Sequence, residues 1–138
     1  PKTPKPQNPN RQCYNWFKYF YIYSLYFEDV LEFIYTVKES GCKIAIDDFG
    51  TGYSNFEYLL KLKADYIKID GSMIKNIDKD DEARAVVSVI VDFAKRMGIK
   101  TIAEFVESES IWRSVKELGI DYSQGYYFSV PAVDLKDE

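Results

Sequence analysis

Histidine is absent from this sequence, and cysteine is scarce, with two residues in 138. Without histidine the chain can build no Ser-His-Asp triad, no Cys-His pair and no His-ligated zinc site. Any catalysis must therefore use carboxylates, lysine, amides or hydroxyls.

The two cysteines, Cys13 and Cys42, form no Cys-x-x-Cys motif. They cannot make a disulfide framework, so a reducing, cytoplasmic setting is expected. No uninterrupted run of about 18 apolar residues occurs, which argues against a transmembrane segment. No small-residue cleavage site follows the basic start, so no signal peptide is predicted.

The length and the 46% of hydrophobic residues suit one domain with a substantial core. Residues 1–27 carry four basic residues and no acid, which leaves 14 of the 18 basic residues and all 22 acids in the remainder. Because affinity for the DNA backbone comes from Lys and Arg, this acidic body argues against DNA as a partner. A small nucleotide held through metal ions remains compatible with it.

The first 26 residues differ in composition from the rest. Four of the five prolines fall within the first ten positions, and nine of the 14 residues from Tyr14 to Phe27 are aromatic. The prolines predict an extended or disordered stretch. The aromatic stretch has neither helical nor two-residue spacing, and we interpret it as a covering segment or a non-native extension rather than a membrane-surface or partner-binding strip.

From residue 27 onward, helical and strand patterns alternate. The spacing of apolar residues predicts helices over residues 28–40, 55–62, 80–97 and 110–118, and strands over residues 43–46, 66–69, 100–104 and 125–129. Alternation of this kind indicates parallel βα units with right-handed crossovers. Four such units make either half of an eight-stranded barrel or an open four-stranded sheet.

Polar side chains lie beside an end of each predicted strand. Since parallel strands end at one edge, we expect these side chains to gather there; they are Asp47, Asp48, Asp70, Glu104, Glu107 and Gln124. A single acid in such a place is usually a turn former or a helix cap, but four strand ends in register favour a functional site. Clustered carboxylates without His suit Mg²⁺ or Mn²⁺, and the adjacent Asp47-Asp48 pair suits two metal ions beside a phosphate.

Lys68 stands within an apolar strand, on the same face as Tyr66 and Asp70. A buried lysine is costly unless it is paired or functional. It is therefore either a salt-bridge partner of Asp70, an edge lysine reaching solvent, or an electrostatic stabiliser of water or a phosphoryl oxygen. The Gly50-Thr51-Gly52 turn after the first strand fits phosphate binding or simply a tight turn.

Four motifs stand in order along the chain: DDFGTGYS at 47–54, Leu62 through Lys68-Ile69-Asp70, AEFVE at 103–107 and QGY at 124–126. Together they closely resemble the EAL-domain family, bacterial cyclic-di-GMP phosphodiesterases with a TIM-like barrel. The resemblance covers about residues 27–131. It implies an α/β fold, a partial TIM-like (β/α) barrel of about four βα units, in which residues 27–138 form the C-terminal half and residues 1–26 an extension of unknown origin.

The resemblance also implies roles for matching residues. Asp47, Asp48 and Glu104 would bind Mg²⁺ or Mn²⁺ in a two-metal site, with Glu104 also helping to activate water. Lys68 would contact the nucleophilic water or the phosphate, and Gln124 would orient the water or the substrate. The implied reaction is hydrolysis of one phosphodiester of cyclic-di-GMP to linear pGpG.

Two further residues have supporting roles by the same resemblance: Asp70 at the end of the Lys68 strand, and Glu107 holding a neighbouring loop. The chain departs from the family at Phe105, where Gly is usual. The family's Glu-x-Leu signature, its strand-borne Asn and the Glu before the first helix are not found in residues 1–26. This chain alone therefore supplies part of the coordination set.

A half barrel has two open sheet edges and an exposed apolar interior, so a homo-oligomer or a missing N-terminal half-barrel is expected as partner. Two readings of function remain. The chain is part of a metal-dependent phosphodiesterase, or it is a degenerate EAL fragment acting as a non-catalytic nucleotide-binding or protein-interaction module. A stand-alone flavodoxin-like binding domain would require the matching motifs to be coincidental.

Overall fold

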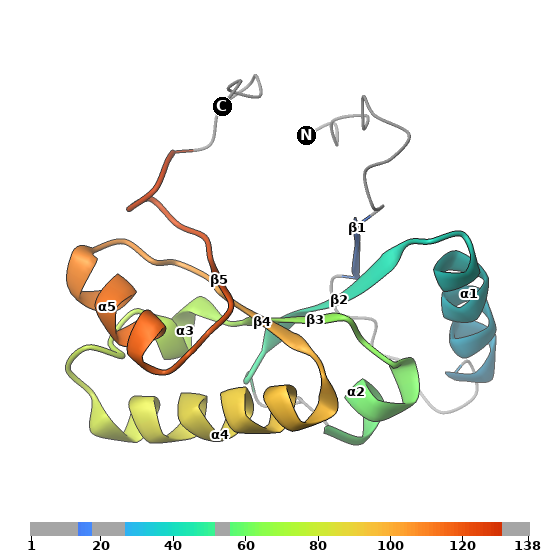
Figure 1. Ribbon diagram of the computed structural model, residues 1–138, viewed down its shortest axis with the longest axis horizontal. Helices are drawn as coiled ribbons and strands as arrows, with labels where there is room; N and C mark the ends of the chain where they lie inside the picture. Colours follow the sequence, from blue (N-terminus) through green and yellow to red (C-terminus); the bar gives the residue numbers. More distant parts are fainter. Residues whose placement is uncertain (1–13, 18–26, 52–55, 131–138) are drawn as a thin grey trace.

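The computed structural model describes residues 14–17, 27–51 and 56–130. Its centre is one parallel sheet in which strand order follows chain order (Figure 1). The strands are β1 (Tyr14–Phe17), β2 (Lys43–Phe49), β3 (Tyr66–Ile69), β4 (Lys100–Ala103) and β5 (Tyr122–Ser123). This sequential parallel order is typical of barrel-type α/β folds, so the predicted class is confirmed.

Within the described residues, five helices connect and flank the strands. They are α1 (Phe27–Glu39), α2 (Phe56–Leu62), α3 (Gly71–Ile74), α4 (Asp81–Met97) and α5 (Glu109–Glu117). Figure 1 shows them lying around one side of the curved row of strands, and no described helix covers the opposite side. Among the helices that the structure describes, none is long and apolar enough to cross a bilayer.

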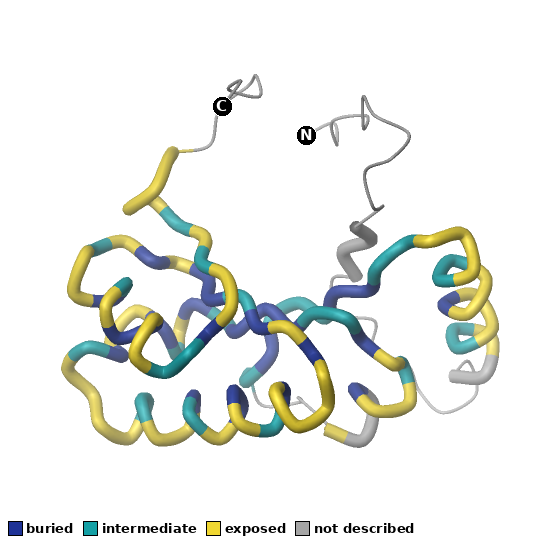
Figure 2. Tube along the Cα trace, in the orientation of Figure 1, coloured by how far each residue is buried: buried dark blue, intermediate teal, exposed yellow. Residues whose placement is uncertain are grey.

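The hydrophobic core lies between the sheet and these helices. Ile67, Ile69 and Ala103 of the strands are fully buried there, together with Val87 and Ala94 of α4. Figure 2 shows this burial concentrated along the strands and on the side of α4 that faces them. Alternate strand residues thus point into the core, which leaves the intervening positions on the other face of the sheet.

The longest helix, α4, begins and ends where its sequence requires. The Asp80 carboxylate accepts hydrogen bonds from the backbone N–H groups of Glu82 and Ala83. Gly98 takes a left-handed conformation with φ of 70° and closes the helix. These two signals explain why the boundaries predicted from the sequence lie close to the observed ones.

The first strand was not predicted. β1 pairs in parallel with β2, from Tyr14 opposite Lys43 to Phe17 opposite Ile46. It therefore joins part of the aromatic stretch to the sheet. The proline-rich residues 1–13 and the aromatic residues 18–26 lie outside the described residues.

The prediction of a strand over residues 125–129 is wrong. The strand is two residues long, Tyr122–Ser123, and the chain then turns, with Phe128 N–H donating to the Gly125 carbonyl at 3.1 Å. Gly125 has a φ of 157°, and a Cβ at this position would lie 2.7 Å from the carbonyl carbon of Val106. Glycine is needed here for a close backbone approach rather than for a strand.

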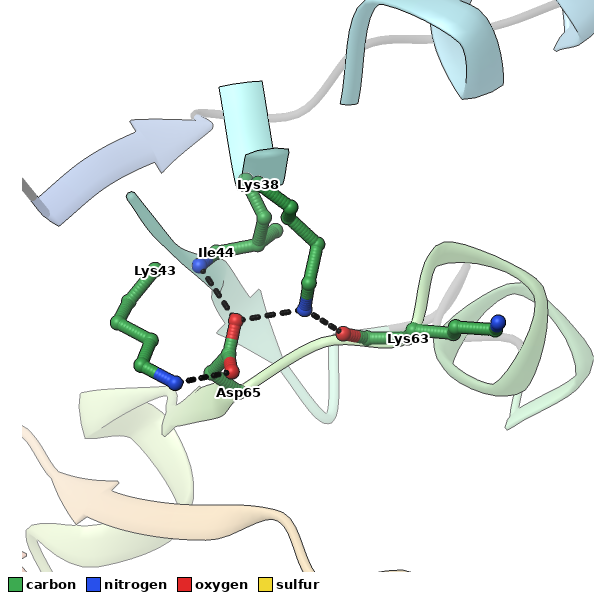
Figure 3. A network of polar contacts seen from close by, with 5 residues as sticks. All are labelled: Lys38, Lys43, Ile44, Lys63 and Asp65. Atoms are coloured by element: carbon green, nitrogen blue, oxygen red, sulfur yellow. Dashed lines mark hydrogen bonds and ion pairs between the residues drawn. The ribbon is translucent and has the colours of Figure 1, made fainter. Parts of the chain in front are cut away.

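The carboxylate of Asp65 connects the amino-terminal ends of β2 and β3 through hydrogen bonds (Figure 3). It accepts hydrogen bonds from Lys38 Nζ at 2.8 Å, from Lys43 Nζ at 3.2 Å and from the backbone N–H of Ile44 at 2.9 Å. Lys38 also donates to the Lys63 carbonyl at 2.5 Å. Burial alone would raise the pKa of Asp65, but these hydrogen bonds outweigh it and lower the pKa.

The same arrangement recurs two strands later, between β4 and β5. Asp121 accepts hydrogen bonds from Lys100 Nζ at 2.6 Å and from the Thr101 backbone N–H at 3.0 Å. In each case an Asp directly before one strand binds the first two residues of the preceding strand. Both aspartates lie at the end of the sheet opposite the predicted site, where stabilising groups are expected in such folds.

Candidate metal centre

Three carboxylates meet at the carboxyl-terminal ends of β2 and β4. One oxygen each of Asp47, Asp48 and Glu104 lies within 4.8 Å of the others. Glu104 is buried, with 7% of its surface exposed, and the two aspartates are half-buried. Parallel pairing produces this meeting, because the last residues of neighbouring strands arrive at the same edge.

Lys68 lies between these acids. It belongs to β3, the strand that separates β2 from β4, and it is 7% exposed. Its Nζ lies 2.8 Å from Asp47 Oδ1 and 2.5 Å from Glu104 Oε1. Lys68 thus pairs with the two flanking strand-end acids. Asp70, the partner considered from the sequence, uses its carboxylate to cap α3 by accepting from Ser72 N–H at 2.9 Å.

Burial and charge act in opposite directions on this group. Burial would lower the pKa of Lys68, but its hydrogen bonds to Asp47 and Glu104 outweigh burial and raise that pKa. Burial raises the pKa of Glu104, and the negative charges of Asp47 and Asp48 add to this, against the opposing effect of Lys68. One ammonium group thus faces three carboxylates, an excess of negative charge that a divalent cation with oxygen ligands would neutralise.

The backbone takes an uncommon conformation directly after two of the acids, Asp47 and Glu104. Asp48, after Asp47, and Phe105, after Glu104, both take left-handed conformations, with φ of 51° and 54°. The Asp48 N–H also donates to Asp47 Oδ1 at 3.1 Å. Neither residue is glycine, so the residue types alone do not predict this shared conformation.

The other predicted site residues lie outside the carboxylate group. Glu107 and Gln124 are exposed. The main chain of Gln124 continues the sheet, with its N–H donating to the Ala103 carbonyl at 2.9 Å and its carbonyl accepting from Val106 N–H at 3.1 Å. Of the glycine turn, Gly50 is described and packs against Met73, while residues 52–55 lie outside the described part of the chain.

The fold and the site define a class: a barrel-type parallel α/β protein whose strand ends present carboxylates and a lysine. The EAL domain family model matches residues 24–131 of the chain. The chain therefore belongs to the EAL domain family.

Curated relatives agree with this assignment. The chain is 40% identical over 101 residues to cyclic di-GMP phosphodiesterase PdeB of Shewanella oneidensis, covering 73% of this chain and 12% of that protein. It is 45% identical over 95 residues to cyclic di-GMP phosphodiesterase PdeF of Escherichia coli, covering 69% and 13%. The chain thus spans about an eighth of the length of these relatives.

Solved structures show the same relation. The manganese and cyclic-di-GMP complex of Klebsiella pneumoniae BlrP1 is 33% identical with a TM-score of 0.72, over 76% of this chain and 27% of that one. The EAL domain of Mycobacterium smegmatis DcpA is 31% identical with a TM-score of 0.71, over 75% and 47%. The described fold is therefore part of an EAL-type, TIM-like barrel, as the motifs implied.

Proposed function

We propose that this chain forms the C-terminal half of a cyclic-di-GMP phosphodiesterase centre, which hydrolyses one phosphodiester of cyclic-di-GMP to give linear pGpG in the cytoplasm. The observation that carries the proposal is the meeting of Asp47, Asp48 and Glu104 around Lys68. Curated relatives named as cyclic-di-GMP phosphodiesterases support the choice of substrate.

Asp47, Asp48 and Glu104 would hold Mg²⁺ or Mn²⁺. Their oxygen donors suit these hard cations, and their excess negative charge favours a divalent ion. Manganese and calcium complexes of the related Klebsiella protein with cyclic-di-GMP support this choice. When bound, such ions supply Lewis-acid stabilisation of the phosphate and lower the pKa of a water molecule.

The remaining chemistry belongs to side chains of this chain. Lys68 is held charged by its two carboxylate partners, so its ammonium group can donate to a phosphoryl oxygen or to the attacking water. Glu104, whose pKa is raised by burial, can accept a proton from that water. Gln124, at the end of β5, would orient the water or the substrate through its amide.

The test is incubation of the chain with cyclic-di-GMP and Mn²⁺, with chromatographic detection of pGpG. Product that disappears in Lys68→Ala supports catalysis by this centre. Lys100→Ala is the matched control, because Lys100 pairs with Asp121 at the opposite end of the sheet and should leave turnover unchanged. Equal turnover in Lys68→Ala and the parent chain would contradict the proposal.

A second candidate is a non-catalytic EAL module that binds a nucleotide or a protein. It is supported by the exposed side chains of Glu107 and Gln124, which lie outside the carboxylate group in the described part of the chain. Binding of cyclic-di-GMP without formation of pGpG would select this function. For both candidate functions, we propose that the partner is a second copy of this chain or an N-terminal half-barrel. A monomeric elution volume in size-exclusion chromatography would argue against self-association.

A further inference from the structure

Phe105 is an exposed aromatic residue between two buried neighbours at the carboxyl-terminal end of β4. Glu104 before it is 7% exposed and Val106 after it is fully buried, whereas 57% of Phe105 is exposed. The Glu104 N–H donates to the Ile69 carbonyl at 3.3 Å, and the Val106 N–H donates to the Gln124 carbonyl at 3.1 Å. Hydrogen bonds to the adjacent strand ends thus fix the main chain on both sides of Phe105, and the side chain itself stays outside the core.

The ring of Phe105 lies over Gly71, at the end of the neighbouring strand. A Cβ built on Gly71 would lie 2.6 Å from Cγ of Phe105, so the ring fills the space that a side chain on Gly71 would take. Gly71 follows Asp70 at the exit of β3, the strand that carries Lys68. The ring therefore lies across the ends of β3 and β4, at the same edge of the sheet as Lys68 and Glu104.

The proposed substrate is larger than the group of charged residues that would hold its phosphodiester. Its guanine bases must lie beyond that group, along the edge of the sheet. Near the site, one ammonium group faces three carboxylates, so a further anionic group would be repelled there, whereas an uncharged base is not. Aromatic rings are the surfaces on which nucleobases stack in proteins, and Phe105 presents such a ring directly beside Glu104.

We propose that Phe105 determines the affinity for the base of the substrate: its exposed ring is a stacking surface for one guanine of cyclic-di-GMP. This inference rests on the proposed function, from which it takes the position of the phosphodiester. Since glycine is usual at this position in the family, the ring adds affinity to a metal site that does not require it. Removing the ring should therefore weaken binding of the nucleotide and leave binding of the metal unchanged.

The test is calorimetric titration of the chain with cyclic-di-GMP in the presence of Ca²⁺, the ion of one solved complex of the related Klebsiella protein. Phe105→Gly removes the ring, and glycine adopts the φ of 54° without strain. We expect Phe105→Gly to bind at least about fivefold more weakly than the parent, the lower end of the effect of removing one stacking ring. Phe105→Tyr keeps the ring and should bind within about twofold of the parent.

Two further variants separate stacking from other effects. Phe105→Leu keeps apolar bulk without an aromatic face, so its affinity should fall as that of Phe105→Gly does. Phe33→Ala is the matched control, because Phe33 is a phenylalanine of similar exposure, 53%, on α1 among the helices that flank the sheet. It should bind cyclic-di-GMP as the parent does. Titration of Phe105→Gly with Mn²⁺ alone should match the parent, since the ring is not a ligand.

The outcomes separate this inference from the proposed function. Weaker binding by Phe105→Gly, together with no pGpG formed by the parent with Mn²⁺, would support stacking and overturn the phosphodiesterase. Equal affinities of Phe105→Gly and the parent would overturn stacking alone, as would an equal loss in Phe105→Gly and Phe105→Tyr. A loss of Mn²⁺ binding in Phe105→Gly would also overturn it, since the ring would then act on the metal site. A parent chain that does not bind cyclic-di-GMP would overturn both proposals.

Discussion

Replacing Lys68 with Met removes the ammonium group and keeps most of the side chain's volume. Lys68 is 7% exposed, and its partners Asp47 and Glu104 have side-chain exposures of 14% and 9%. Breaking one partner out of a buried ion pair costs about 3–5 kcal/mol, since the remaining charge is left uncompensated. Because Glu104 can take up a proton instead, we expect the lower end, about 3 kcal/mol of unfolding free energy at neutral pH.

The assay is urea unfolding of Lys68→Met and the parent without divalent ions, at several pH values. The difference should shrink as the pH falls toward the raised pKa of Glu104, because a protonated Glu104 needs no counter-charge. Lys100→Met is the control, since the Lys100 side chain is 56% exposed and its loss should leave the urea midpoint close to that of the parent. Equal urea midpoints for Lys68→Met and the parent at neutral pH would refute the reasoning.

Three further expectations concern stability. Asp65→Ala should lose about 2 kcal/mol in urea unfolding, since it leaves the buried Ile44 N–H without its carboxylate acceptor; an unchanged midpoint would contradict this. The pKa values of Asp65 and Asp121 are lowered from 3.8, so the stability they add is present above that value and is lost as the pH falls through the lower folded values. The difference in unfolding free energy between Asp65→Asn and the parent should accordingly become smaller below pH 3.8, as measured by circular dichroism across an acid titration. A difference that stays constant with pH would show that the ionisation of Asp65 does not contribute to stability. Gly125→Ala should lower the free energy of unfolding by about 2 kcal/mol, measured by calorimetry, because the added methyl group would overlap the Val106 backbone. An unaltered melting temperature would show that the turn can accommodate the methyl group.

The alternating elements could be predicted because their signals are local. The capping Asp80 and the closing Gly98 bound α4 in the sequence as they do in the structure. The strand-end positions of Asp47 and Glu104 followed from the buried runs before them. Parallel topology then brought these acids together without any need to know side-chain conformations.

The features that were missed depend on contacts between distant residues. β1 is defined by pairing with β2, and its aromatic sequence carries no two-residue alternation. α3 is four residues long and begins at Gly71, so it has neither the length nor the composition that marks a helix. The left-handed conformation of Phe105 was equally hidden, because the residue that accommodates it stands 34 positions earlier.

The central claim is that Asp47, Asp48 and Glu104 hold a divalent cation, and titration with Mn²⁺ followed by electron paramagnetic resonance tests it most directly. The account predicts binding by the parent chain that weakens about tenfold or more in Glu104→Gln and in Asp47→Asn. Glu117→Gln, an exposed acid paired with Arg84, should bind as the parent does. Equal affinities in Glu104→Gln and Glu117→Gln would contradict the claim.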